Sequence, residues 1–168
     1  AFLDRALAGG CPEAAYSNQL GFEISNRAVD DKDLLFERLV PRDPSSINRY
    51  IGYLCEIGDH ESAKRAWQEK VSYGFNSSRE ETIRYIELLI GHGDLNEGFE
   101  VWKDALREEG FRAPSDGNLI TNGGFEQDKL LGGGFDWKIA KVKGAEIAFD
   151  SSVAFEGKRS LRIAFDGK

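Results

Sequence analysis

Residues 49–67, RYIGYLCEIGDHESAKRAW, and residues 84–102, RYIELLIGHGDLNEGFEVW, decide the fold of the longer, first part of the chain. The two stretches align without a gap at an offset of 35 residues. Self-similarity at such a period is typical of repeat architectures, in which each repeat is one small structural unit. The identical pairs are Arg49/Arg84, Tyr50/Tyr85, Ile51/Ile86, Leu54/Leu89, Gly58/Gly93, Asp59/Asp94 and Trp67/Trp102.

Each unit predicts a helical hairpin that turns at a Gly-Asp pair. The apolar residues of the first unit recur at helical spacing, at Ile47, Tyr50, Ile51 and Leu54. A helix start, a helix end and the next helix start are indicated in turn by Asp43-Pro44, Gly58 and Asp59. The corresponding signals of the second unit are Ser77 or Ser78 with Glu80 or Glu81, then Gly93, then Asp94 with Glu97.

The hairpins resemble tetratricopeptide repeats over about residues 43–111. That family shares the Gly-Asp turn, a small residue early in the second helix and an aromatic residue four positions later. The chain departs from the family at residues 51 and 86, where isoleucine replaces a small residue, and it lacks the usual proline after the second helix. The resemblance implies a degenerate α-solenoid over residues 1–113. The residues expected to pack between its helices are Ala63, Trp67, Gly98 and Trp102.

The pattern changes from helical to strand-like after a linker at residues 114–117, which contains Pro114 and Gly117. Two stretches, AEIAFD (145–150) and SLRIAFD (160–166), alternate apolar and polar residues and predict strands. Gly157-Lys158-Arg159 predicts the turn between them. Two further strands are predicted at NLIT (118–121) and FDWKIA (135–140). The second part of the chain, residues 118–168, is therefore expected to be an antiparallel β domain with one apolar face.

The phrase NGGFE (122–126), the later Trp137 and the phrase SVAFEGKRSLRIAF (152–165) resemble the beginning of the galactose-binding-like β-sandwich of carbohydrate-binding modules. The resemblance covers about residues 118–166 and implies a partial, jelly-roll-like sandwich. It also implies a structural calcium ion held by Glu126 with backbone oxygens of Gly157 and Lys158, since calcium takes oxygen ligands. Trp137 could stack on a sugar ring or pack between the sheets.

Charge and residue spacing exclude several other classes of function. Residues 117–168 carry 8 Lys or Arg and 7 Asp or Glu, which leaves a net charge of −8 on the first 116 residues. Such a surface disfavours nucleic acid, even though a 35-residue period is also found in pentatricopeptide RNA-binding proteins. His60 and His92 lie at no metal-ligand spacing and are expected to be exposed turn residues. Cys11 and Cys55 form no recognisable framework, and Cys55 is expected to be a small buried apolar residue.

The sequence therefore predicts a non-enzymatic scaffold with no catalytic residues. Its repeats would bind a protein partner, and its incomplete β module would contact polysaccharide. The order of the two parts resembles bacterial envelope proteins of polysaccharide synthesis or export, which implies a periplasmic or envelope location. The alternative is the non-catalytic region of a larger glycan-active enzyme. We expect the chain to be a piece of a longer protein and to contain no membrane span itself. We also expect residues 118–166 either to pack against the helices or to be completed by another chain, which includes association with a second copy through the exposed β edges.

Overall fold

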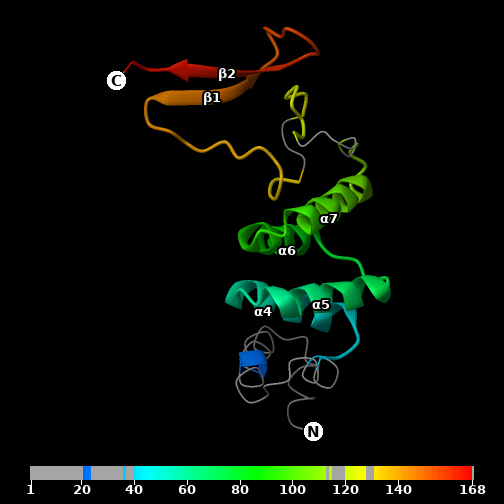
Figure 1. The fold of residues 1–168 in the computed structure, drawn as a ribbon. Coiled ribbons are helices and arrows are strands. Elements are labelled where there is room, and N and C mark those ends of the chain that lie inside the picture. Colours follow the sequence, from blue (N-terminus) through cyan, green and yellow to red (C-terminus); the bar gives the residue numbers. More distant parts are fainter. Residues whose placement is uncertain are drawn as a thin grey trace. The chain divides into compact units, whose positions relative to one another are not determined.

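The computed structural model describes residues 21–23, 36, 40–112, 114, 120–127 and 131–167 (Figure 1). The chain divides into two compact units, Ala1–Asp94 and Leu95–Lys168, and each is described by itself. The predicted mixture of helices followed by antiparallel strands is confirmed. Its elements are α4 (Pro44–Ile57), α5 (His60–Ser72), α6 (Arg79–His92), α7 (Leu95–Glu108), β1 (Ala145–Asp150) and β2 (Ser160–Phe165). Within the described ranges, none of the helices combines the length and the apolar character needed to cross a membrane.

The ends of α4 and the start of α5 confirm the predicted signals. The Asp43 carboxylate accepts a hydrogen bond from the backbone N–H of Ser46 at 3.0 Å, and proline is the first residue of α4. Gly58 has a φ of 71°, which a residue with a side chain adopts only with strain, and it ends the helix. Asp59 then caps α5 through the N–H of Ser62 at 3.3 Å. Each such N-cap stabilises its helix by about 1 kcal/mol.

The start of α6 is the predicted capping box. The Ser78 hydroxyl accepts from the N–H of Glu81 at 3.2 Å, and the Glu81 carboxylate accepts from the N–H of Ser78 at 2.8 Å. Two of the amides that a helix start leaves unpaired are satisfied in this way. The helix ends as predicted at Gly93, whose φ is 85°.

The core of the first unit comes from the apolar faces predicted for α4, α5 and α6. Trp67 of α5 stacks on Tyr85 of α6, with ring centroids 4.3 Å apart and planes inclined by 14°. Ala63 is fully buried one helical turn before Trp67. This contact joins the second helix of the first hairpin to the first helix of the next. Other fully or almost fully buried apolar side chains of the described residues include Ile47, Tyr50, Ile51, Leu54, Ala66, Ile86 and Leu89.

Two aromatic groups organise the second unit. Phe99 and Trp102 of α7 both pack against Phe135, with centroid distances of 5.3 and 5.9 Å. Gly98 and Trp102 are both buried. A second group brings Phe125 within 5.2 Å of Trp137 and 6.2 Å of Phe149.

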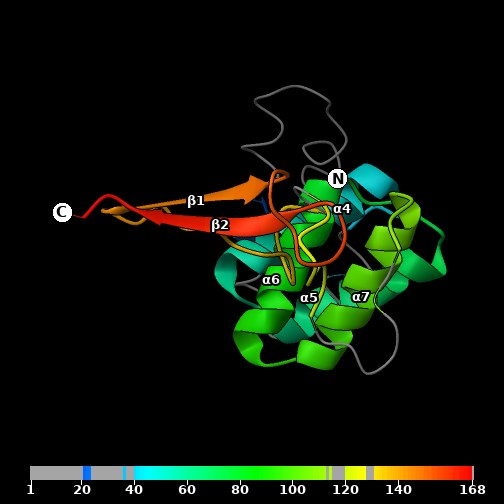
Figure 2. The ribbon, with the colours of Figure 1, turned by 90° about the horizontal axis from the view of Figure 1, so that it is seen from above.

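The described strands form one antiparallel pair, which lies side by side in both views (Figures 1 and 2). The register places Ile147 opposite Ile163 and Phe149 opposite Leu161, so that the predicted apolar residues share one face. A complete sandwich is not present in these ranges. The strand predicted over 135–140 is wrong, because this stretch has no ladder, and residues 120 and 121 lie in no strand either. Alternation predicts which face a residue takes, but it cannot supply a neighbouring strand.

The helical region predicted over residues 1–113 lies outside the described ranges at 1–20, 24–35, 37–39 and 113. Three other sequence predictions fall wholly or partly on such residues. They are the start of the first predicted strand (118–119), most of the linker (115–117) and Cys11.

Candidate functional site

A groove of about 370 Å³ lies on the first unit, along the face that α4 and α6 share. Its walls mix charged, amide and aromatic side chains, as expected of a site that recognises a polar ligand. The lining residues are Phe22, Asn48, Arg49, Ile51, Gly52, Tyr53, Cys55, Glu56, Trp67, Lys70, Ser78, Glu80, Glu81 and Arg84.

The two arginines of the groove occupy equivalent positions in the two repeats. Arg49 is held by its own helix, because its guanidinium donates to the carbonyl oxygen of Ser45 at 3.2 Å and to the Ser45 hydroxyl at 2.7 Å. Arg84 lies 3.7 Å from a carboxylate oxygen of Glu56, and both side chains are about half exposed. An exposed pair at this distance contributes little stability, so a ligand can replace it.

The packing of α4 on α6 leaves room for the Arg84 guanidinium. A Cβ atom on Gly52 would stand 3.4 Å from an Arg84 terminal nitrogen, which is an ordinary van der Waals contact. This glycine is therefore part of the groove wall beside Arg84, at a cost in helix propensity within α4.

Asn48 gives the groove an amide that is only partly satisfied. Its Nδ2 donates to a carboxylate oxygen of Glu81 at 3.1 Å. Its Oδ1 is buried and has no hydrogen-bond donor among the described residues. A buried acceptor without a donor is costly, and a ligand N–H could satisfy it only after the groups that cover this oxygen had moved.

Cys55 lies in the groove wall and is a free cysteine. Burial raises the pKa of its thiol to about 11; nearby Arg84 opposes this rise and Glu56 adds to it. We expect the thiol to react about 100-fold more slowly at pH 8 than an exposed cysteine, because the thiolate is the reactive form. A colorimetric thiol assay on a Cys11→Ser variant measures this rate. The same variant unfolded in guanidinium is the control, and equal rates in the two states would contradict the prediction.

Lys70 is a buried lysine beneath the groove, with 1% of its surface exposed. Its ammonium lies 4.6 Å from the centre of the Trp67 ring and contacts the Ser77 hydroxyl. The side chain thus ties the loop before α6 to the end of α5. Sequence reasoning missed this contact, since a lysine near the end of a helix is usually solvated.

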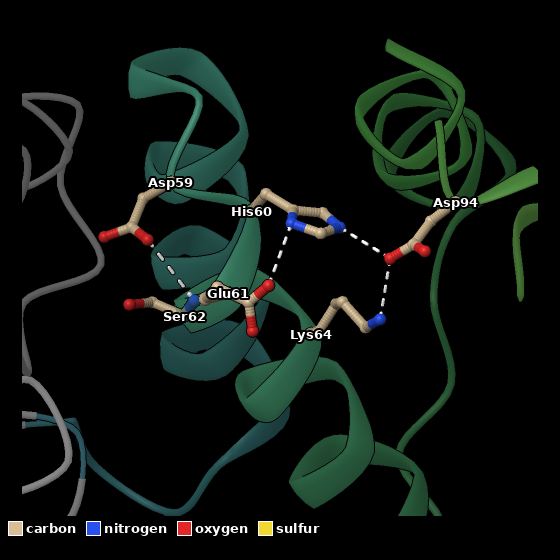
Figure 3. Close-up of polar contacts among 6 residues, drawn as sticks. All are labelled: Asp59, His60, Glu61, Ser62, Lys64 and Asp94. Carbon is tan, nitrogen blue, oxygen red and sulfur yellow. Dashed lines mark hydrogen bonds and ion pairs between the residues drawn. The ribbon is translucent and has the colours of Figure 1, made fainter. Parts of the chain in front are cut away.

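A polar cluster joins the first Gly-Asp turn to the second (Figure 3). Nε2 of His60 lies 2.7 Å from Oδ2 of Asp94, and the Lys64 ammonium donates to the same oxygen at 2.7 Å. Nδ1 of His60 faces a carboxylate oxygen of Glu61 at 3.3 Å. The two aspartates of the repeat therefore differ in role, since Asp59 caps its own helix while Asp94 binds side chains of the other hairpin.

His60 and His92 come together although they are 32 residues apart. Their rings stack in parallel, with centroids 4.7 Å apart and planes inclined by 3°. His92 is exposed as predicted, but the side chain of His60 is only 16% exposed, so the prediction of a solvated turn residue is wrong for His60. The signal that could have found the contact is the repeat itself, which places both histidines beside equivalent Gly-Asp turns.

The cluster predicts a loss of stability in acid. Hydrogen bonds from Lys64, and then from His60, lower the pKa of Asp94 against a smaller opposing effect of burial. A carboxyl with a lowered folded-state pKa adds stability above the unfolded value of about 3.9, and this contribution disappears as the pH falls through the folded value. We expect Asp94→Asn to reduce the difference in unfolding free energy between pH 6 and pH 3, measured by urea unfolding of the helical signal.

The remaining acid sensitivity should persist in that variant, because other carboxyls contribute. Hydrogen bonds from Ser46 lower the pKa of Asp43 although burial opposes them, and hydrogen bonds from Ser152 lower that of Asp150. Lys64→Gln should reproduce part of the effect of Asp94→Asn. An unchanged pH dependence in both variants would contradict the assignment.

The Glu126 carboxylate contacts the backbone of the turn at residues 157–159, close to Gly157 and Lys158. Its carboxylate accepts from the backbone N–H of Lys158 at 2.9 and 3.1 Å and from that of Arg159 at 3.3 Å. Gly157 has a φ of 76°, and a Cβ there would stand 2.1 Å from the Glu126 oxygen. The turn therefore requires glycine both for its backbone and for the space that the carboxylate fills.

These contacts do not fit a calcium ion as arranged. Amide N–H groups face Glu126, whereas calcium requires six to eight oxygen ligands. Among the described residues there is also no group of three or more His, Cys, Asp and Glu side chains that could hold a metal. Calcium at Glu126 stays a prediction.

The side chain of Trp137 is held in place by two contacts and is still about half exposed. Its indole N–H donates to the carbonyl oxygen of Thr121 at 2.7 Å, and its ring packs on Phe125. The side chain is nevertheless 48% exposed. The two readings of the sequence, packing and sugar contact, are thus compatible in one residue.

No family model matches the chain, and neither the curated proteins nor the solved structures include a significant match to it.

Proposed function

We propose that the chain is a non-enzymatic interaction scaffold whose helical unit binds an extended segment of a partner protein in the α4–α6 groove. The observation that carries the proposal is the pair of repeat-equivalent arginines, Arg49 and Arg84, on the wall of that groove. Stacked hairpins of this kind form binding surfaces from side chains that recur once per repeat.

The two arginines, rather than the summed charge of the groove, favour a ligand that carries carboxylates, because Glu56, Glu80 and Glu81 line the groove as well. Arg49 makes hydrogen bonds only within its own helix and forms no ion pair in the part of the chain that the structure describes. Among the described residues, the ion pair that Arg84 forms is the loose, half-exposed contact with Glu56. Guanidinium groups bind carboxylates through paired N–H donors. Both arginines can therefore bind a ligand carboxylate without first breaking a strong ion pair.

The amide and the aromatic wall favour a polypeptide over another anion. A bound segment that displaced the groups covering the unsatisfied oxygen of Asn48 could donate to it an N–H, which a peptide backbone offers at every residue except proline. Trp67 adds an apolar contact in the same groove. Phosphate backbones lack N–H donors, and the net charge of −8 on the first 116 residues opposes them as well.

Selection from a random peptide library displayed on phage tests the proposal. The library is first depleted on the double variant Arg49→Ala, Arg84→Ala, and the remaining phage are then selected on the full wild-type chain. We expect enriched peptides that contain Asp or Glu. Failure to enrich any sequence over repeated rounds, with a known peptide-binding protein as the positive control, would contradict the proposal.

A second candidate function, contact with a glycan, is favoured by Trp137. Its fixed N–H and its exposed ring form a rigid apolar surface suited to the face of a sugar ring. Titration with soluble polysaccharides, followed by tryptophan fluorescence, tests this function. We expect a change in fluorescence that Trp137→Ala removes. An equal change in the wild type and in Trp137→Ala, or no change with any glycan, would contradict it.

A further inference from the structure

Residues 137–143, WKIAKVK, form an exposed extended segment immediately before β1. Figure 1 shows this segment running back along β1, on the side away from β2, and separating from it with distance from the turn. It contains three lysines and no acidic residue. Three large apolar side chains are about half exposed in it, namely Trp137, Ile139 and Val142. The sequence predicted a strand over part of this segment, and the structure leaves that part without a neighbouring strand.

One contact already joins the segment to β1. Val142 and Ala145 form an isolated antiparallel bridge, in which the N–H of Ala145 donates to the carbonyl oxygen of Val142 at 3.3 Å. Lys143 and Gly144 lie between them, and Gly144 has a φ of 85°. A two-residue connection with glycine in this region is typical of a β-hairpin.

The two edges of β1 differ in their backbone hydrogen bonding, because one edge pairs with β2 and the other is open. Glu146 and its alternate neighbours direct their backbone groups toward β2, as the hydrogen bond from the Asp166 N–H to the Gly144 carbonyl oxygen (3.0 Å) indicates. Because these directions alternate along a strand, the backbone groups of Ala145 and Ile147 point to the open edge. Open edges of this kind accept strands from other chains unless they are covered.

The bridge fixes the register of any further pairing. One step along, Lys141 stands opposite Glu146, which is an attractive pair of charges on the polar face. The next step places Ala140 opposite Ile147 on the apolar face, and the third places Ile139 opposite Ala148. Beyond this point Lys138 would face Phe149, which is unfavourable.

We propose that residues 139–142 are a strap that adds to the open edge of β1 as a third strand, with Lys141 opposite Glu146. The strap ends at Ile139, so Trp137 keeps its hydrogen bond to Thr121. Closure gives the sheet the order strap, β1, β2 and covers the edge by which two copies of the chain would otherwise associate.

Nuclear magnetic resonance on the full, isotopically labelled chain tests the strap directly. Lys141 and Glu146 would be a non-hydrogen-bonded pair with close Cα atoms, so we expect a nuclear Overhauser contact between their Hα protons. The amides of Ala140 and Ile147 should exchange at least ~100-fold more slowly than in an unstructured chain. Unprotected amides at both residues would overturn the proposal, and so would a contact that isotope filtering shows to be between two copies.

A disulfide pair gives an independent test on a background of Cys11→Ser and Cys55→Ala. Lys141→Cys with Glu146→Cys should form an intramolecular disulfide under mild oxidation, detected by mass. The matched control is Lys141→Cys with Ala148→Cys, which places the second thiol on the same face but two residues out of register. Equal yields in the two variants, or mainly cross-linked dimers in the first, would overturn the proposal.

Discussion

Trp67→Ala is expected to destabilise the helical unit by about 3 kcal/mol. The indole stacks on Tyr85 at 4.3 Å and also covers the ammonium of the buried Lys70. Truncating a packed tryptophan to alanine costs about 3–5 kcal/mol, and the lower value applies because Trp67 is only partly buried. Urea unfolding followed by the far-ultraviolet helical signal measures the change.

Two further variants show whether stacking between the repeats is the cause. Trp67→Phe keeps a ring against Tyr85 and should lose less than half as much stability. Trp137→Ala removes an indole from the other unit and should leave the helical transition in place. A Trp67→Ala chain that unfolds within 0.5 kcal/mol of the wild type would show that the two hairpins do not depend on this contact.

Gly157→Ala is expected to destabilise the second unit by about 2–3 kcal/mol, part of it from backbone strain at positive φ. The rest comes from Glu126, because the new methyl group would occupy the position of its carboxylate oxygen. The carboxylate would move away and lose its bonds to the amides of Lys158 and Arg159. Thermal unfolding followed by near-ultraviolet circular dichroism measures the effect.

Gly167→Ala is a matched control for this substitution. Gly167 also has a positive φ, 72°, but a Cβ there would meet nothing within 4 Å. The Gly167→Ala variant should therefore lose only about 1 kcal/mol of stability, all of it from backbone strain. In a Glu126→Ala background, the destabilisation caused by Gly157→Ala should fall to the same value. If Gly157→Ala costs equally much with and without the Glu126 carboxylate, the contact between them is not what makes glycine necessary.

The helix boundaries could be predicted from the sequence because their causes are local. Asp43, Ser78 and Gly93 each act on a backbone group within a few residues, so a short stretch contains the whole interaction. The paired faces of β1 and β2 were predictable for a similar reason. Alternation assigns the face, and the Gly157 turn allows the chain to return.

The groove and the histidine stack could not be predicted in this way. Asn48 and Glu81 are 33 residues apart, and His60 and Asp94 are 34 apart. Their meeting depends on how one hairpin lies on the next, which propensity and periodicity do not determine. The repeat did contain a partial signal, since Arg49 and Arg84 share a repeat position, but sequence reasoning treated that identity as evidence of fold alone.

Isothermal titration calorimetry with a phage-selected peptide measures whether the α4–α6 groove binds peptide. The comparison includes the wild-type chain, the double variant Arg49→Ala, Arg84→Ala, and Arg107→Ala, which removes an exposed arginine outside the groove. We predict a dissociation constant in the ~micromolar range for the wild type and for Arg107→Ala. The double variant should bind at least ~10-fold more weakly, a loss of about 1.4 kcal/mol or more. Equal affinity in all three chains would show that the peptide does not bind through the arginines of this groove.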